Sequence, residues 1–431
     1  MAAFKSIPGT FDILPDGYTS GGDYVAPVHV WRRLEEVVRD VMSQYGAAEI
    51  RTPILEPTEL IARGVGASSD IVTKEMFAFE RGSTNYVMRP EVTAPVMRSY
   101  LQHSLAQKGG TQRLYYIGPC FRAERPQKGR YRQFHQFGLE VIGAADARAD
   151  AETIVSLRDI LERLGIKQYS LRLNSLGDAE SRPAFRQALV DYFTPLEAEL
   201  TEVSRNRLRT NPLRILDTKV EKERALLENA PRLTEFLDEE SKAHHELVKE
   251  YLDSAGISWI DDPFLVRGLD YYSRTTYEFE SPLLGAQSSI AGGGRYDLLS
   301  KEVGSKEAIP AVGFAAGMER IIMAMMAEEI SEGEQDRPDV FLVALGDAAI
   351  AWTFSAATRL RQKGLKVTYD LRGRSMKAQM REANRQNARF VAIAGDDELV
   401  SGQVQLKDMA EGVQEALSLD EIAPRVASSP S

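Results

Sequence analysis

Hydrophobic residues in the first third of the chain change from a helical spacing to a strand-like one. Apolar side chains recur every three or four positions over residues 28–45 and stop at Gly46, which predicts an amphipathic helix. Residues 49–55 then predict a strand that Pro53 interrupts. Short β-rich runs alternate with turn residues over 77–145, which is typical of an antiparallel sheet.

The pattern changes in the middle of the chain. Residues 178–256 are highly charged, poor in glycine and rich in Glu, Leu, Ala and Lys, which predicts several helices and no strand. Strand-like runs return over 258–298, and a helix is predicted over roughly 314–328. We therefore expect the helical block to be an insertion that splits one β-rich domain.

The last part of the chain has a third pattern. Residues 331–338 are polar and suit a linker between domains. Strand-like and helix-like runs alternate beyond it, which predicts a small α/β unit with a parallel or mixed sheet over 339–431. The predicted organisation is thus a split domain of residues 1–177 and 257–330, the insertion, the linker and this unit.

Composition limits the chemistry that the protein can carry. The 431 residues are 43% hydrophobic and 27% charged, as in ordinary folded proteins. The single cysteine, Cys120, excludes an internal disulfide and a cysteine-rich metal site, and five histidines argue against a multi-histidine metal centre. Acidic residues outnumber basic ones by 63 to 53, and the net charge of −10 argues against binding nucleic acid through bulk charge.

No signal peptide or membrane-spanning segment is evident in the sequence. The N-terminal residues lack the basic start and long apolar run of a signal peptide. The most membrane-like run, residues 340–358, carries Asp347 and is better interpreted as a strand, a turn and a helix. With the low cysteine content, this predicts a cytoplasmic protein with no membrane partner.

Local charge differs from the net charge in two segments. Residues 359–389 include ten basic residues and only two acidic ones, which gives a local net charge of +8. On charge alone, a solvated helix face explains this stretch as well as an RNA contact does. A second cluster over 122–132 has five basic residues against Glu124 and is interleaved with aromatic residues, which suits phosphate contact with base stacking.

Arginines in the β-rich half are candidates for phosphate binding, because a guanidinium binds phosphate through two parallel hydrogen bonds. They are Arg89, Arg122, Arg130, Arg267, Arg295 and Arg320. A structural ion pair explains any one of them, whereas several on one sheet favour a phosphate site. The sequence has neither a P-loop nor a G-x-G-x-x-G motif that opens a helix, so a nucleotide would need another scaffold.

Two further pairs of polar residues are placed to act together. Glu91 and Thr93 share one face of an extended segment and could hold an ammonium group, although spacing alone favours a capping pattern before the next helix. Gln136 and Glu140 share one face of a predicted strand.

Five segments together resemble the histidyl-tRNA synthetases, a family of class II aminoacyl-tRNA synthetases. Motif 2 of that class is similar to FRAERPQKGRYRQFHQFGLEVIG (121–143). Motif 1 is similar to EIRTPILEPTELIARGVG (49–66), and motif 3 is similar to AVGFAAGMERIIM (311–323). LVRGLDYYSRTTYEFE (265–280) and AGGGRYDLL (291–299) resemble the two histidine-specific signatures. The resemblance runs over nearly the whole chain, and RGLDYY with the long motif 2 is its most specific part.

The resemblance implies a fold and a reaction. It implies an α+β class II catalytic core, with an antiparallel sheet flanked by helices, a helical insertion and a C-terminal α/β anticodon-binding domain. The implied reaction ligates L-histidine to tRNA(His) through a histidyl-adenylate, with ATP as substrate and AMP and diphosphate as products. The alternative is an inactive, synthetase-like regulatory subunit of ATP phosphoribosyltransferase, but such subunits typically lack the C-terminal domain.

The resemblance also gives the arginines roles. It places Arg122 on the α-phosphate of ATP, Arg320 at the γ-phosphate and Phe134 against the adenine. Arg267 would lie across the histidine carboxylate and the α-phosphate, where a fixed guanidinium stabilises the charge that develops. Mg²⁺ is expected with ATP, without a metal site of the protein's own.

The implied histidine pocket follows from the chemistry of imidazole, which has one N–H donor and one acceptor when neutral. Glu140 would accept from the ring and the Tyr272 hydroxyl would donate to it. The ammonium would be held by Glu91, Thr93 and Gln136. The pocket would be shaped by Tyr271 and Tyr296.

The remaining implied contacts concern macromolecules. Arg130 would face the acceptor end of the tRNA, and motif 1 implies a homodimer. The basic stretch 359–389 would then belong to the anticodon-binding domain. Two departures from the family pattern are Val92, where glycine is frequent, and a longer segment over 17–27. We expect Val92 to stiffen a strand beside the ammonium pocket, and 17–27 to form a surface loop.

Overall fold

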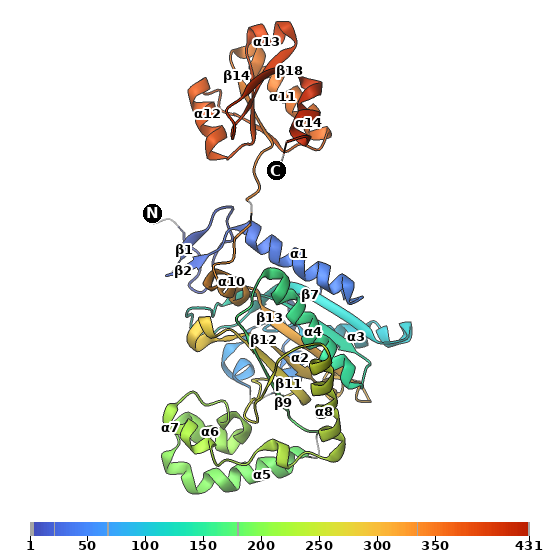
Figure 1. The fold of residues 1–431 in the computed structure, drawn as a ribbon. Helices are drawn as coiled ribbons and strands as arrows, with labels where there is room; N and C mark the ends of the chain where they lie inside the picture. Colours follow the sequence, from blue (N-terminus) through green and yellow to red (C-terminus); the bar gives the residue numbers. More distant parts are fainter. Residues whose placement is uncertain (1–3, 21, 67–68, 179–180, 334, 430–431) are drawn as a thin grey trace. The chain divides into compact units, whose positions relative to one another are not determined.

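The computed structural model describes residues 4–20, 22–66, 69–178, 181–333 and 335–429. The chain divides into two compact units, Met1–Gly333 and Glu334–Ser431. Figure 1 shows their helices and strands.

A large sheet forms the centre of the first unit. Its described residues give eight strands in the order β10-β9-β11-β12-β13-β8-β7-β3. Neighbouring strands are antiparallel, except that β10 pairs with β9 and β3 with β7 in parallel at the two edges. The strands are β3 (Ala48–Glu49), β7 (Gln112–Phe121), β8 (Gln133–Ile142), β9 (Ser170–Ser175), β10 (Ile260–Asp261), β11 (Ser273–Glu280), β12 (Ser289–Arg295) and β13 (Ala311–Gly317). The predicted antiparallel sheet is confirmed.

Helices cover one face of this sheet. They are α1 (Val28–Gln44), α4 (Ala147–Leu164), α8 (Glu239–Ser254) and α10 (Met318–Ala327). The alternation of side chains along β8 separates the two faces. Phe137, Leu139 and Val141 are buried in the core with these helices. Phe134, Gln136 and Glu140 have the opposite parity, so they lie on the other face.

The other face is flanked by two helices and a small sheet. The helices are α2 (Thr58–Val65) and α3 (Thr93–Gln102). The small sheet contains β4 (Leu55–Pro57), β5 (Phe77–Arg81) and β6 (Thr84–Met88), in the order β4-β6-β5. The strand predicted over 49–55 is not continuous, because β3 ends at Glu49 and β4 begins at Leu55. Pro53 has no N–H to donate to a strand ladder, and the chain passes from the large sheet to the small one around it.

The inserted segment is helical. Its elements are α5 (Ser181–Phe193), η3 (Thr194–Glu199), α6 (Glu202–Thr210), η4 (Pro212–Ile215), α7 (Glu221–Leu227), η5 (Leu233–Glu235) and α8. No strand occurs between residues 181 and 256, all of which the structure describes, so the predicted helical character is confirmed. The last of these helices, α8, packs against α4 on the helical face of the large sheet.

Three local expectations are wrong. The helix predicted over 314–328 begins only at Met318, because the small residues before it pair with β8 and β12 as strand β13. The segment 17–27 contains the antiparallel hairpin β1 (Tyr18–Ser20) and β2 (Asp23–Val25) rather than a loop alone. Val92 is not in a strand; it is the buried N-cap residue of α3.

The second unit is a sheet with helices, and its strands follow the order β15-β14-β16-β17-β18. The first three strands are parallel and the last two pairings antiparallel, which confirms the predicted mixed sheet. Its elements are β14 (Val340–Ala344), α11 (Asp347–Gln362), β15 (Val367–Tyr369), α12 (Met376–Arg385), β16 (Phe390–Ala394), α13 (Asp396–Ser401), β17 (Gln403–Asp408), β18 (Gln414–Ser418) and α14 (Leu419–Ala427). Of the helices that the structure describes, none is long and apolar enough to cross a membrane.

Candidate active site

A cavity of about 190 Å³ opens on the face of the large sheet that carries Phe134 and Gln136. Ten of the twelve residues to which the resemblance gives a role line it: Glu91, Thr93, Arg122, Arg130, Phe134, Gln136, Arg267, Tyr271, Tyr272 and Arg320. They come from β8, the start of α3, the segment before β11, the loop between β7 and β8, and α10. Residues far apart in sequence thus converge on one hollow.

Two glycines of the sheet make room for charged side chains of this site. A Cβ atom at Gly292 in β12 would collide with the guanidinium of Arg267. A Cβ atom at Gly313 in β13 would collide with the carboxylate of Glu140. Glycine at these strand positions therefore lets a long polar side chain lie flat on the backbone.

Two buried carboxylates lie at the inner end of the site. Glu91 accepts hydrogen bonds from the backbone N–H of Thr93, at 2.7 Å, and of Ala94, at 3.1 Å, so it caps the start of α3. Glu140 accepts from the Thr93 hydroxyl at 2.7 Å and from the Tyr296 hydroxyl. Burial raises the pKa of Glu91 to about 7 and that of Glu140 to about 8. Within the described part of the chain, neither carboxylate has an ion-pair partner.

Glu140 and Tyr296 are the two residues of the implied histidine pocket that do not line the cavity. Each is about 1% exposed. Thr93, which does line the cavity, donates to Glu140, so this carboxylate lies one hydrogen bond behind the cavity wall. The Tyr271 ring contacts the rings of Tyr272 and Tyr296, with centroids 4.6 and 5.6 Å away.

Arg267 lies across Gly292 and forms an ion pair with Glu278 on β11. Burial alone would lower the pKa of this guanidinium, but Glu278 and the neighbouring tyrosines raise it above its ordinary value. Its Nε is buried and has no hydrogen-bond partner among the described residues. A fixed cation with an unused donor thus lies in the cavity wall.

Three further arginines add positive charge to the cavity wall. Arg320 donates to the backbone carbonyls of Gly129, at 3.1 Å, and Ser289, at 2.7 Å. Burial lowers the pKa of Arg320, and the nearby Arg130 and Arg122 lower it further. Clustered cations that repel one another favour an anionic ligand, and the phosphates of a nucleotide have that charge. The Arg122 guanidinium carbon lies 5.2 Å from the centre of the Phe134 ring.

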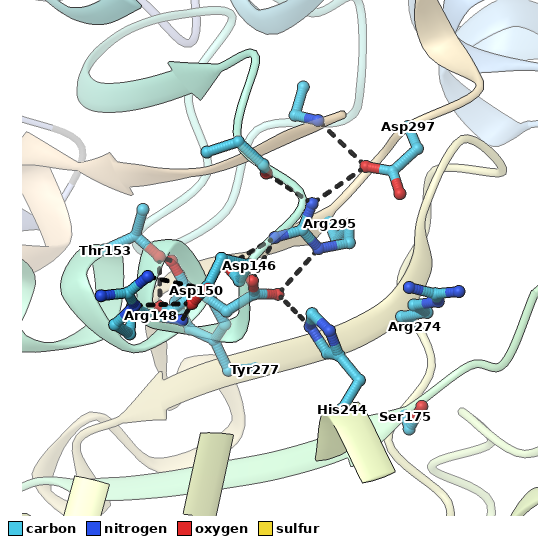
Figure 2. Close-up of polar contacts among 12 residues, drawn as sticks. Asp146, Arg148, Asp150, Thr153, Ser175, His244, Arg274, Tyr277, Arg295 and Asp297 are labelled. Atoms are coloured by element: carbon cyan, nitrogen blue, oxygen red, sulfur yellow. Dashed lines mark hydrogen bonds and ion pairs between the residues drawn. The ribbon is translucent and has the colours of Figure 1, made fainter. Parts of the chain in front are cut away.

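Two arginines proposed as phosphate ligands have structural contacts instead. Arg89 donates to the carbonyls of Pro119 and Thr52, both at 2.9 Å. Arg295 is fully buried on the helical face, where it forms an ion pair with Asp150 of α4. Figure 2 shows this cluster, in which His244 of α8 also approaches Asp150, at 3.3 Å. Neither arginine lines the cavity, so for these two candidates the structural alternative holds.

Sequence reasoning missed three carboxylates that hold the site together. Glu278 pairs with Arg267, and Glu124 pairs with Arg130 at 3.1 Å. Glu319 accepts a hydrogen bond from the backbone N–H of His135 at 2.9 Å and lies 3.0 Å from its ring nitrogen. The sequence holds a signal for all three carboxylates, because each lies within a segment that also carries a proposed arginine.

Cys120 lies on β7, opposite Phe134 of β8. It is fully buried and its thiol donates to the side-chain oxygen of Gln136 at 3.3 Å. Burial raises the pKa of this thiol to about 12, so the reactive thiolate is scarce near neutral pH.

Comparison with known proteins gives a consistent family. The family model described as histidyl-tRNA synthetase matches residues 26–321, and the model described as an anticodon binding domain matches 339–429. A histidine–tRNA ligase of Chloroherpeton thalassium is 47% identical over 418 residues, 96% of each chain. That of Synechococcus elongatus is 44% identical over 426 residues, 98% of this chain and 94% of the other. The crystal structure of apo S. aureus histidyl-tRNA synthetase is 36% identical and has a TM-score of 0.81, covering 98% of this chain and 100% of that one.

Proposed function

We propose roles for the cavity residues from the premise that the chain belongs to the histidyl-tRNA synthetase family. Its function is the ATP-dependent ligation of histidine to tRNA. The near full-length likeness to histidine–tRNA ligases and the anticodon-binding match favour the ligase over an inactive regulatory subunit. One observation carries the assignment of the site, namely that four arginines and two buried carboxylates without an ion-pair partner among the described residues line or adjoin a single cavity.

Adenylate formation is the first step. A carboxylate oxygen of histidine attacks the α-phosphorus of ATP, a new P–O bond forms, and the bond to diphosphate breaks. Arg122 would hold the α-phosphate, and Arg267 would bridge it to the attacking carboxylate. No proton has to move, so positioning and neutralisation of charge supply the rate. The unused Nε of Arg267 is a donor available for that bridge.

The rest of ATP would occupy the positive end of the cavity. Arg320 would hold the γ-phosphate and Phe134 would stack on the adenine. Among the described residues, no group of three His, Cys, Asp or Glu side chains could hold a metal. Mg²⁺ would therefore enter with the phosphates of ATP. Glu124 and Glu319 line the same cavity and could add carboxylate oxygens to its coordination shell.

Histidine would occupy the end of the cavity with the buried carboxylates. Glu91, Thr93 and Gln136 would hold the α-ammonium, whose charge compensates the ionised carboxylate. The imidazole N–H would bond to Glu140, which has lone pairs left beside those that Thr93 and Tyr296 use. The Tyr272 hydroxyl would donate to the other ring nitrogen.

The second step transfers histidine to the tRNA. Arg130 would face the acceptor end, because it lines the cavity from the loop between β7 and β8. We assign the catalytic core to residues 1–177 and 257–330, the insertion to 178–256, the linker to 331–338 and the anticodon-binding domain to 339–431. The insertion is proposed to close over the acceptor stem.

Part of the basic stretch 359–389 is already neutralised within the second unit. Arg359 and Lys363 pair with Asp420, and Arg385 pairs with Glu382. Exposed basic side chains remain on and before α12, at Arg372, Lys377 and Arg381. We propose that these three, beside the 86% exposed Leu371, contact the anticodon loop.

A homodimer through the small sheet is also proposed. Leu55 on β4 and Phe79 on β5 are each 46% exposed, and Ile54 is 41% exposed. Apolar side chains gathered on one sheet favour a covered interface. We further propose a cytoplasmic location.

Pyrophosphate exchange tests the first step. The protein is mixed with ATP and labelled diphosphate, and exchange is measured with and without histidine. Exchange that does not depend on histidine would contradict the roles proposed here. Arg267→Ala should lower exchange by roughly 10³-fold while histidine binding, followed by calorimetry, remains measurable. An equal loss of binding and exchange would show that Arg267 does not act mainly in the transition state.

A further inference from the structure

The helical insertion contacts the RGLDYY segment through side chains of η4 and its preceding residue. Arg214 donates to the backbone carbonyl of Gly268 at 2.9 Å and lies 3.4 Å from a carboxylate oxygen of Asp270. The side-chain amide of Asn211 donates to the same oxygen at 3.1 Å. The Arg214 side chain is only 11% exposed, so this contact is largely buried. The insertion thus holds the segment by both its backbone and its acidic side chain.

Asp270 is enclosed from its other side by the segment that resembles motif 1. Its backbone N–H donates to the carbonyl of Val65, the last residue of α2, at 3.2 Å. The next residue is Gly66, and a Cβ atom there would collide with the Asp270 side chain. Gly66 also has a φ of 99°, which only glycine adopts at little cost. Asp270 is therefore fixed between the core and the insertion.

This fixed point lies three residues after Arg267. Arg267 lines the ligand cavity and also a second cavity of about 790 Å³, whose wall includes Asn211 and Arg214 of the insertion. Arg267 thus borders open space on the side of the insertion. Its place depends on the ion pair with Glu278 and on the anchoring of its own segment.

We propose that Arg214 and Asn211 are positioning residues for adenylate formation. They hold Asp270 and Gly268, and through this segment they hold Arg267 where the carboxylate of histidine meets the α-phosphate. The insertion then takes part in the first step of the reaction, before any tRNA is present. This inference rests on the proposed role of Arg267.

Histidine-dependent pyrophosphate exchange by the full chain without tRNA tests the inference. Arg214→Ala should lower kcat by roughly 10 to 10²-fold, because a small displacement of a catalytic group is costly. The KM for ATP should not change, because Arg214 does not line the ATP cavity. Asp270→Ala should have a similar effect that does not add to that of Arg214→Ala, whereas Asp270→Asn should keep most of the activity.

Two further variants separate positioning from a loss of folding. Asn211→Ala removes one hydrogen bond with a smaller change and should lower kcat in the same direction, with thermal unfolding followed in parallel. Arg209→Ala on α6 is the matched control, because this 74% exposed arginine pairs with Glu197 within the insertion. Its kcat should equal that of the wild type.

The outcomes separate the positioning role of Arg214 and Asn211 from the role of Arg267 itself. Normal kcat in both Arg214→Ala and Asn211→Ala, with loss in Arg267→Ala, would overturn this inference and leave the role of Arg267 intact. An additive effect of Arg214→Ala and Asp270→Ala would also overturn it. Normal exchange in Arg267→Ala would overturn the role of Arg267, and this inference with it.

Discussion

Two buried acidic clusters lie on opposite faces of the same sheet and behave in opposite ways. On the helical face, burial alone would raise the pKa of Asp150, but Arg295 and His244 lower it below its ordinary value. On the cavity face, burial raises the pKa of Glu140 to about 8, and no ion-pair partner compensates it among the described residues. Burial opposes ionisation of both carboxylates. Neighbouring cations overcome it at Asp150, whereas at Glu140 it favours the neutral acid.

Consecutive residues of the chain contribute to these two clusters. Arg295, the last residue of β12, contacts Asp150 (Figure 2), and Tyr296 directly after it donates its hydroxyl to Glu140. The AGGGRYD segment therefore places a compensating cation on one face and a neutral donor on the other. A buried acid with its own cation supports the fold, whereas one without a cation is suited to receive a cationic substrate.

Stability should respond most strongly on the helical face. Asp150→Asn removes the fully buried charge partner of Arg295 and leaves it the ion pair with Asp297, so the free energy of unfolding should fall by up to roughly 3–5 kcal/mol. Denaturation of the full chain by urea measures the change. Arg148→Ala is the control in the same region, because this arginine is 72% exposed and its pair with Asp146 should contribute under about 1 kcal/mol. Equal losses in the two variants would contradict the comparison.

Function should respond most strongly on the cavity face. Glu140→Gln removes the charge but keeps the size of the side chain, and kcat/KM for histidine should fall by roughly 10²-fold. Unlike Asp150→Asn, it should not lower the unfolding temperature at pH 8, because it removes a carboxylate that lacks a cation. Glu162→Gln, at a 54% exposed carboxylate of α4, should change neither quantity. Marked destabilisation by Glu140→Gln would show that this acid has a structural role as well.

Arg267 and Arg295 show how far the sequence could predict the site. Both lie near glycines in the β-rich half, and both are candidates for phosphate binding from the sequence alone. Their difference depends on which face of the sheet each side chain reaches and on Asp150, which is 145 residues away from Arg295. Alternation along strands predicted the sheet well, because it is local. Pairing between distant residues is not local, and for that reason Glu278 and the contact of Arg214 with Asp270 were not predicted.

The pH dependence of histidine binding is the smallest expected effect. It is also the sharpest test of the difference between the two acidic clusters. In the empty protein, Glu91 and Glu140 have pKa values of about 7 and about 8, above the ordinary 4.5. Groups with raised pKa values favour folding at low pH, and their contribution is lost as the pH rises through 7 to 8. The ammonium of histidine favours the ionised carboxylates, so binding should release protons and tighten from pH 6 to 8.

The change in affinity should be at most about tenfold per pH unit for each proton released. Calorimetry in two buffers of different ionisation enthalpy counts those protons. In Glu140→Gln the release above pH 7 should diminish, leaving the titration of the imidazole of histidine itself. Asp150→Asn, measured where it is still folded, should keep the pH dependence of the wild type, because Asp150 is already ionised in the empty protein. Two results would contradict the assignment of stability to the helical face and of function to the cavity face. One is proton uptake when histidine binds, and the other is loss of the pH dependence of binding in Asp150→Asn.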